Sequence, residues 1–415
     1  MSGSSLPWDP TFDIEPAEVR RAVFYGLGSD GTVSANKASI RLIGAEAGLH
    51  AQAYFEYDSR KAGSTTVSHL RFGPRPIRAP WRIANASFVA IHDAGLIERR
   101  DAMALAAPGA TVLLNSPQPP RELFATLPLE MQETLIAKRC RLFAVDAQAV
   151  ARQAGLGGRI SPVMQACFFA LSDVMPREAA MAVLRTATAA RWQRRGAEVV
   201  RRNLAALDGA LAALHEVTLP AAPVSGRHRP PVVPDGAPDF VQRVTRLLLE
   251  GHGDDLPVSA FPPDGTWPTD TARFEKRALA PEIPIWQPDL CVQCNRCVMI
   301  CPHAAIRAKA YDPAALAAAP ESFRHVPEAF TPGLEGYTLQ VAPEDCTGCG
   351  LCIEICPGRD RRAPDRRALM PEPLALHRDT ERAGYAFFET LRDATAAMPP
   401  DHRNLGFRAP LFEFS

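Results

Sequence analysis

The segment CVQCNRCVMICP (residues 291–302) has the same cysteine spacing as the segment CTGCGLCIEICP (residues 346–357). Both read C-x2-C-x2-C-x3-C-P, the pattern of proteins that hold two [4Fe–4S] clusters. The first three cysteines of each run bind one cluster and the fourth binds the other, so the predicted ligand sets are interleaved. We expect cluster one to be held by Cys291, Cys294, Cys297 and Cys356, and cluster two by Cys346, Cys349, Cys352 and Cys301.

Zinc and disulfide bonds are alternative uses of these cysteines. Zinc sites usually combine paired C-x2-C runs or added histidines, so a run of four that occurs twice fits zinc poorly. Disulfides need an oxidising compartment, and residues 1–16 are polar, without the apolar core of a secretory signal. Cys140 and Cys167 have no cysteine at ligand spacing and are expected to lie outside the metal sites.

Composition indicates a globular protein. The chain has 415 residues, 47% of them hydrophobic, which is enough for two or three domains with a substantial core. The 46 basic and 46 acidic side chains cancel, so neither nucleic acid nor an anionic membrane is expected as a partner. No apolar run approaches the length of a membrane span. We therefore expect a cytoplasmic protein.

The region 17–218 is predicted to be an α/β domain. Short apolar strands alternate with helical patterns, which indicates a mostly parallel sheet with helices on both faces. The predicted strands are Val23–Tyr25, Ala51–Tyr57, Phe88–Ile91, Thr111–Leu114 and Leu142–Val145. The predicted helices are Thr32–Ile43, Pro120–Arg139, Arg177–Arg191 and Glu198–Leu214.

The loop GLGSDG (residues 26–31) lies between the first strand and the first helix and matches the pattern G-x-G-x-x-G. Asp30 places a carboxylate in this loop, where it would repel a pyrophosphate at the helix N-terminus. A dinucleotide site, a site for another phosphate-bearing group and a purely structural turn are therefore all open. A bound phosphate would face Gly26, Gly28, Gly31, Asn36 and Lys37.

Three other polar features have both a functional and a structural interpretation. His69 and Arg71 either orient a ligand or a neighbouring domain, or they form a hydrogen-bonded corner. His303, which follows Cys301-Pro302, either tunes the potential of a cluster or packs without a redox role. The basic run Arg359–Arg367 is either a solvated surface or a contact for an acidic partner.

The rest of the chain divides by composition. A proline-rich segment, expected to be an ordered strap with one amphipathic helix at Phe240–Leu249, connects the α/β domain to the cysteine-rich region. A helix is predicted at Leu374–Ala397, and the apolar run PLFEFS (residues 410–415) needs to be covered by something else. The predicted division is an N-terminal tail at 1–16, the α/β domain at 17–218, the strap at 219–283, a small α+β two-cluster domain at 284–370 with an insertion at 302–345, and a C-terminal helix and strap at 371–415.

Several longer motifs resemble those of pyruvate:ferredoxin (flavodoxin) oxidoreductase, and the resemblance extends over roughly residues 18–415. They are GLGSDGTV (26–33), NK (36–37), VSHLRFG (67–73), LPVSAF (256–261), PHAAIR (302–307) and VAPEDC (341–346). The resemblance implies a middle segment of that enzyme: a gamma-type α/β domain, a strap and a two-[4Fe–4S] ferredoxin-like domain. The thiamine diphosphate domains that flank this segment in the family are not in the sequence.

The resemblance also implies a function. The family oxidatively decarboxylates pyruvate with coenzyme A, and this chain would pass the electrons through its two clusters to ferredoxin or flavodoxin. It would not decarboxylate alone, because thiamine diphosphate is expected only in a partner subunit or in missing domains. The Gly26 to Lys37 loop would contact coenzyme A. The alternative is a stand-alone dicluster carrier or scaffold for another oxidoreductase, and the identity of the 2-oxoacid and of the acceptor stays open.

Overall fold

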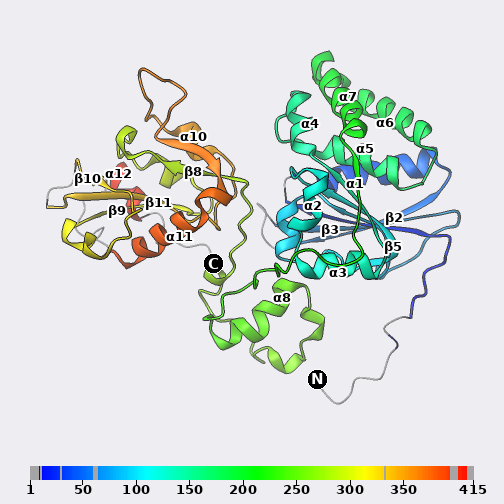
Figure 1. Cartoon of the computed structure of the whole chain (residues 1–415), viewed down its shortest axis with the longest axis horizontal. Helices are drawn as coiled ribbons and strands as arrows, with labels where there is room; N and C mark the ends of the chain where they lie inside the picture. The colour runs from blue at the N-terminus through cyan, green and yellow to red at the C-terminus, as the bar shows by residue number, and fades with distance from the viewer. Residues whose placement is uncertain are drawn as a thin grey trace. The chain divides into compact units, whose positions relative to one another are not determined.

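The computed structural model describes residues 9, 12–28, 30–58, 64–330, 333–392 and 401–408 (Figure 1). The chain forms two compact units. The α/β unit contains Met1–Val232 and Arg246–Ala260, and the cysteine-rich unit contains Val233–Thr245 and Phe261–Ser415. No helix among the described residues is both long and apolar enough to cross a membrane.

The α/β unit is built on one seven-stranded sheet with the order β2-β3-β1-β4-β5-β6-β7. The ladders β1–β4, β4–β5 and β5–β6 are parallel, whereas β3 is antiparallel to both β1 and β2, and β7 is antiparallel to β6. Five strands therefore point one way, and the expectation of a mostly parallel sheet is confirmed. The strands are β1 Arg20–Leu27, β2 His50–Tyr57, β3 Thr65–Gly73, β4 Ala86–Ile91, β5 Ala106–Asn115, β6 Arg141–Val145 and β7 His215–Val217.

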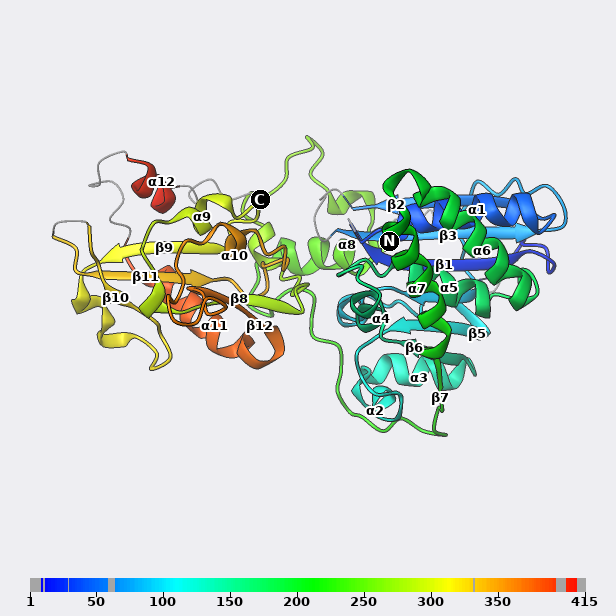
Figure 2. The ribbon, with the colours of Figure 1, turned by 90° about the horizontal axis from the view of Figure 1, so that it is seen from above.

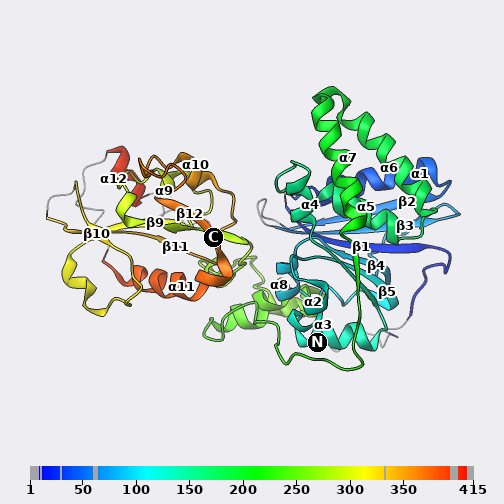
Figure 3. The same ribbon diagram turned by 45° about the horizontal axis from the view of Figure 1, so that its top comes forward.

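Helices cover both faces of this sheet, as the sequence predicts (Figure 3). Alternate residues of β1 point to opposite faces, so Phe24 joins one apolar core while Val23 and Tyr25 join the other. One face carries α1 Thr32–Glu46, α4 Ala147–Gln153, α5 Ser161–Leu171, α6 Arg177–Trp192 and α7 Ala197–Ala212. The other face carries α2 Pro120–Thr126 and α3 Leu129–Ala137.

One local prediction for this unit is wrong, and two elements were not predicted. The helix expected at 120–139 is two helices, because Pro128 starts α3 and leaves Leu127 extended. The polar segment at 65–74 is β3, a strand buried along most of its length. Helix α5 was not expected from the sequence, because its residues are apolar on all sides and lack helical periodicity.

The cysteine-rich unit is α+β, which agrees with the sequence. It has a three-stranded antiparallel sheet, β10-β11-β9, and a separate antiparallel pair, β12-β8. Helix α11 packs on one face of the larger sheet, and α9 and α12 pack on the other (Figure 2). The elements are β8 Glu282–Trp286, α9 Arg296–Ile300, β9 Ile306–Tyr311, β10 Val326–Pro327, β11 Gly336–Val341, α10 Leu351–Ile355, β12 Leu369–Pro373, α11 Leu374–Thr390 and α12 His402–Arg408.

Several other segments differ in part from what the sequence predicts. The helix predicted at 240–249 is a π-helical turn, Val241–Thr245, followed by α8, Arg246–Glu250. Helix α11 ends at Thr390, and the remainder of its predicted range, like the apolar run at 410–415, reaches residues outside the described part of the chain. The predicted insertion at 302–345 contains β9, β10 and β11 and thus supplies the larger sheet of this unit.

Phe168 is the central side chain of the core that faces α5, and its loss should be costly. It is 1% exposed, and its ring lies 5.0 Å from that of Phe24 and 5.2 Å from that of Phe88. Phe168→Ala should lower the free energy of unfolding of the α/β unit by about 3–5 kcal/mol, measured by urea denaturation. Val258→Ala, at a side chain that is 90% exposed, is the control and should change it by less than about 0.5 kcal/mol. Equal effects of the two variants would contradict this packing.

Candidate functional site

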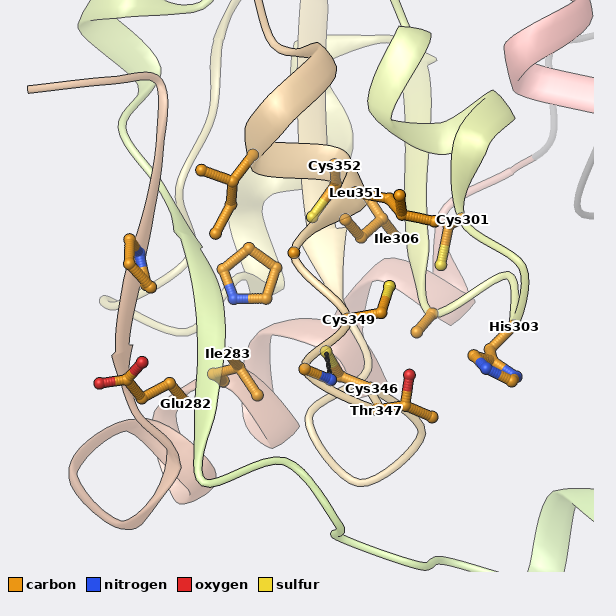
Figure 4. A pocket seen from close by; sticks show the side chains of 16 residues that line it. Glu282, Ile283, Cys301, His303, Ile306, Cys346, Thr347, Cys349, Leu351 and Cys352 are labelled. Carbon is orange, nitrogen blue, oxygen red and sulfur yellow. Dashed lines mark hydrogen bonds between the residues drawn. The ribbon is translucent and has the colours of Figure 1, made fainter. Parts of the chain in front are cut away.

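The eight cysteines of the two runs surround two cavities in the cysteine-rich unit. The larger cavity, about 190 Å³, is lined by Cys301 together with the first three cysteines of the second run (Figure 4). The smaller, about 20 Å³, is lined by Cys356 together with the first three cysteines of the first run. Each cavity therefore takes its fourth thiol from the other run, and the structure brings together the same groups of four that the spacing predicts as ligand sets.

The two cysteine loops share one backbone conformation. Gln293 and Asn295 have φ angles of 52° and 56°, and the matching residues of the second run, Gly348 and Gly350, have φ angles of 69° and 76°. This left-handed conformation directs backbone N–H groups inward. The N–H of Gln293 donates to Cys291 Sγ at 3.4 Å, and the N–H of Gly348 donates to Cys346 Sγ at 3.5 Å.

The first run holds non-glycine residues in this conformation by fixing their side chains. Gln293 Nε2 donates to the carbonyl of Pro327 at 2.7 Å, and Asn295 Oδ1 accepts from the Tyr337 hydroxyl at 2.8 Å. Asn295 Nδ2 also donates to the carbonyl of Arg403 in α12 at 3.0 Å. These bonds offset a backbone cost of about 1–2 kcal/mol per residue. Gln293 and Asn295 were not singled out in the sequence, although an alignment of the two runs shows them at glycine positions.

Helix α12 packs against the first cysteine loop and is hydrogen-bonded to it. Arg403 Nε donates to the carbonyl of Gln293 at 2.9 Å, and Arg403 Nη2 donates to both carboxylate oxygens of Glu328 at 2.6 and 2.7 Å. The Glu328 side chain is 0% exposed, so the ion pair is shielded from water. Gly406 lies directly against Asn295, where any side chain would collide. Helix α12 thus holds the loop through the carbonyl of Gln293 and through the side chain of Asn295.

The electrostatics of the thiols suit a cationic group. Burial and the neighbouring thiols together raise the pKa of Cys352 to about 12 and that of Cys346 to about 11. Burial and the surrounding thiols also hold the pKa of Cys297 well above its usual range. Four thiolates around one cavity would repel each other strongly, whereas iron coordination deprotonates thiols and offsets their negative charge.

The spacing of the thiols favours a polynuclear cluster over a single ion. Zinc would draw four ligands to within about 2.0–2.3 Å of one point. Across the described residues, no group of three or more His, Cys, Asp or Glu side chains converges in a way that could hold one metal ion. The cysteines instead stand around a space, as Figure 4 shows for the larger cavity. The donor set therefore fits a [4Fe–4S] cluster in each position.

The remaining cysteines lie elsewhere, and His303 lies near one cavity. Cys167 is fully buried in the core of the α/β unit, where its pKa is raised by burial to about 12, and Cys140 is also buried there. Neither lines a cavity with the eight cysteines. His303 lines the larger cavity together with Cys301 and Cys349 (Figure 4).

In the glycine-rich loop, the chain's own carboxylate takes the place of a bound anion. Asp30 accepts hydrogen bonds from the N–H of Thr32 at 2.7 Å, from its hydroxyl at 2.7 Å and from the N–H of Leu27 at 2.8 Å. Gly26 is required here, because a Cβ would lie 2.5 Å from Thr32 Oγ1, and Gly31 has a φ angle of 86°. The loop thus has a complete structural explanation without a ligand.

The two residues predicted beyond this loop lie in the first turns of α1. Asn36 is buried, and the Lys37 ammonium lies 5.2 Å from the centre of the Phe55 ring. Gly28 donates its N–H to the carbonyl of Ser64 at 2.6 Å. A role of Gly26, Gly28, Gly31, Asn36 and Lys37 in binding a phosphate stays a prediction.

His69 and Arg71 form a structural corner on β3. Ile83 N donates to His69 Nδ1 at 3.2 Å, so the ring proton is on Nε2, which donates to Glu56 at 2.6 Å. This bond holds the pKa of Glu56 below its usual value. Arg71, 1% exposed, donates to Glu15 at 2.6 Å and to the carbonyl of Trp81 at 2.9 Å. Their hydrogen bonds tie residues from four parts of the chain together.

His92 should make the stability of the α/β unit depend on pH. The side chain is 3% exposed, its Nδ1 lies 2.7 Å from Thr32 Oγ1, and burial lowers its pKa below 6.5. Below about pH 6.5, His92 binds a proton in the unfolded chain but not in the folded chain. The free energy of unfolding therefore falls as the pH falls, by at most about 1.4 kcal/mol per pH unit. His92→Gln should flatten this dependence between pH 7.5 and 5.0, measured by urea unfolding. The exposed His50→Gln should leave it unchanged, and identical slopes in wild type and His92→Gln would overturn the assignment.

Comparisons with known proteins agree with these sites. Residues 21–213 match the family described as pyruvate ferredoxin/flavodoxin oxidoreductase, 226–280 match a domain of unknown function, and 290–359 match a 4Fe-4S dicluster domain. The dicluster match shows that the cysteine-rich unit is a site for two [4Fe–4S] clusters.

The curated relatives are much longer than this chain. Pyruvate-flavodoxin oxidoreductase of Rhodospirillum rubrum is 46% identical over 99% of this chain and 35% of its own length. A probable pyruvate-flavodoxin oxidoreductase of Escherichia coli is 46% identical over 100% of this chain and 36% of its own length. The pyruvate oxidoreductase subunit PORC of Thermotoga maritima, a solved structure, aligns with 48% of this chain and 99% of its own at 17% identity and a TM-score of 0.38. The chain spans about a third of the length of its curated relatives and contains a pyruvate ferredoxin/flavodoxin oxidoreductase domain followed by a 4Fe-4S dicluster domain.

Proposed function

We propose that this chain is the electron-transfer part of a pyruvate, or other 2-oxoacid, oxidoreductase that delivers electrons to ferredoxin or flavodoxin. The observation that carries the proposal is the pair of four-thiol cavities, held in a unit that follows a pyruvate ferredoxin/flavodoxin oxidoreductase domain. When bound, each [4Fe–4S] cluster supplies one-electron redox chemistry at a potential that the surrounding protein sets.

The ligands that we propose follow the two cavities. The first group is Cys291, Cys294, Cys297 and Cys356, and the second is Cys301, Cys346, Cys349 and Cys352. The left-handed loops direct backbone N–H groups at the sulfurs, and the apolar lining, including Ile283, Ile306 and Leu339, keeps water away from them. Cys349 is exposed, which supports an approach of the electron acceptor toward the second group.

Decarboxylation is assigned to a partner. Since the chain spans about a third of its curated relatives, a thiamine diphosphate-bearing subunit or domain would supply the carbon chemistry and the electrons. Contact of coenzyme A with the loop of Gly26, Gly28, Gly31, Asn36 and Lys37 stays a prediction. A phosphate at the N-terminus of α1 would first have to displace the Asp30 carboxylate from the N–H group of Thr32.

Metal analysis and partner capture test this proposal together. The anaerobically purified chain should contain about eight iron and eight sulfide and should give spin-coupled [4Fe–4S] EPR signals on reduction. Capture from native extract should retain a thiamine diphosphate-containing protein, and the reduced chain should reduce ferredoxin or flavodoxin. Zinc in place of iron would refute the cluster assignment. Eight iron with no thiamine partner, together with reduction of unrelated reductases, would instead identify a stand-alone carrier.

The interleaved ligand sets predict a specific pattern among serine variants. Cys301→Ser lies in the first run, but it should damage the same cluster as Cys349→Ser in the second run. The EPR and Mössbauer spectra of these two variants should therefore match each other and differ from those of Cys294→Ser. Cys140→Ser, at a buried thiol outside both cavities, is the control and should keep about eight iron. A Cys301→Ser spectrum that matches Cys294→Ser would show that the sets are not interleaved.

A further inference from the structure

Trp286 has a buried N–H group that its surroundings leave without a hydrogen bond. The residue ends β8, and its side chain is 2% exposed. Its indole Nε1 forms no hydrogen bond in the structure. A buried N–H without an acceptor is unfavourable, so such a group usually has an acceptor in the functional state.

The acceptor that the geometry offers is a cluster sulfur. Trp286 lines the smaller cavity together with Cys291. Its ring stands edge-on to Tyr337, with centroids 6.0 Å apart, but the Tyr337 hydroxyl is committed to Asn295.

The internal repeat gives this position a natural comparison. The segment WQPDLC (286–291) aligns with VAPEDC (341–346), since each contains a proline three residues before the first cysteine of its run. Trp286 therefore corresponds to Val341, which is 0% exposed and has no side-chain donor. Both side chains fill a buried position before a cysteine loop, but only the first can donate a hydrogen bond.

We propose that the Trp286 indole N–H donates to a cysteine thiolate of cluster one and thereby raises the reduction potential of that cluster, an influence that cluster two lacks at the matching Val341. The proposal rests on the cluster assignment made above. Reduction adds negative charge to the cluster and its thiolates, so a hydrogen bond to sulfur stabilises the reduced state more than the oxidised state. Trp286 is thus a potential-setting residue for one of two clusters that have similar loops.

The first test is a redox titration of Trp286→Phe, followed by EPR. This variant keeps an aromatic ring in the core and removes the indole N–H donor. The potential of cluster one should become more negative, with a shift of roughly tenfold in its reduction equilibrium, or about 59 mV for one electron. The potential of cluster two should stay as in wild type. Trp267→Phe is the matched control, because it makes the same substitution at a partly exposed tryptophan of the same unit that lines neither cavity, and it should leave both potentials as in wild type.

A second measurement on the wild-type chain does not depend on how a variant folds. In protein labelled with indole-¹⁵N tryptophan, pulsed EPR of the reduced state should detect coupling of cluster one to one ¹⁵N nucleus. Absence of this coupling, or an unchanged cluster-one potential in Trp286→Phe, would overturn the inference while leaving the iron content and the proposed function intact. Absence of [4Fe–4S] signals from wild type would instead overturn the proposed function and the inference with it.

Discussion

The cysteine-rich unit is organised around the problem of keeping four thiolates together inside protein. Burial alone favours the neutral thiols, and each thiolate makes the next one harder to form. Iron coordination, backbone N–H groups and a shell that excludes water together make the arrangement favourable. This requirement explains the left-handed residues at 293, 295, 348 and 350, since only that backbone turns N–H groups toward sulfur within a two-residue gap.

The two cysteine runs satisfy the same requirement by different means. The second run uses Gly348 and Gly350, which adopt the left-handed conformation at little cost. The first run uses Gln293 and Asn295 and holds them through β10, β11 and α12. The two runs are therefore alike in cysteine spacing but are held by different contacts. Hydrogen bonds tie the first loop to α12, a helix more than a hundred residues later in the chain.

The part of this structure that could be predicted from the sequence follows from strict chemical spacing. The cysteine runs predict which thiols meet, because cluster coordination leaves few geometries, and apolar strands between helices predict the mostly parallel sheet. Strand β3 was missed because Ser68, His69 and Arg71 look like surface residues, yet partners from distant segments satisfy the His69 and Arg71 side chains in the interior. The contacts of Trp286 and Arg403 could not be predicted, because they depend on which distant elements pack over the loops.

In the α/β unit, the glycine-rich loop is another place where the contacts could not be predicted from the motif. Its motif suggests a bound phosphate, but Asp30 supplies the negative charge from within the chain. The Thr32 N–H at the start of α1 has the Asp30 carboxylate as its acceptor, and Gly26 and Gly31 are required by close contacts and a positive φ angle.

The different support of the two cysteine loops also gives them different tolerance to sequence change. At 348 and 350, almost any substitution introduces backbone strain, so drift is limited at the site itself. At 293 and 295, the backbone already accommodates side chains, and the limit lies in distant partners such as Tyr337 and Arg403. Accepted changes in the first loop must therefore occur together with changes in β11 or α12, whereas changes in the second loop are limited by the two glycines themselves.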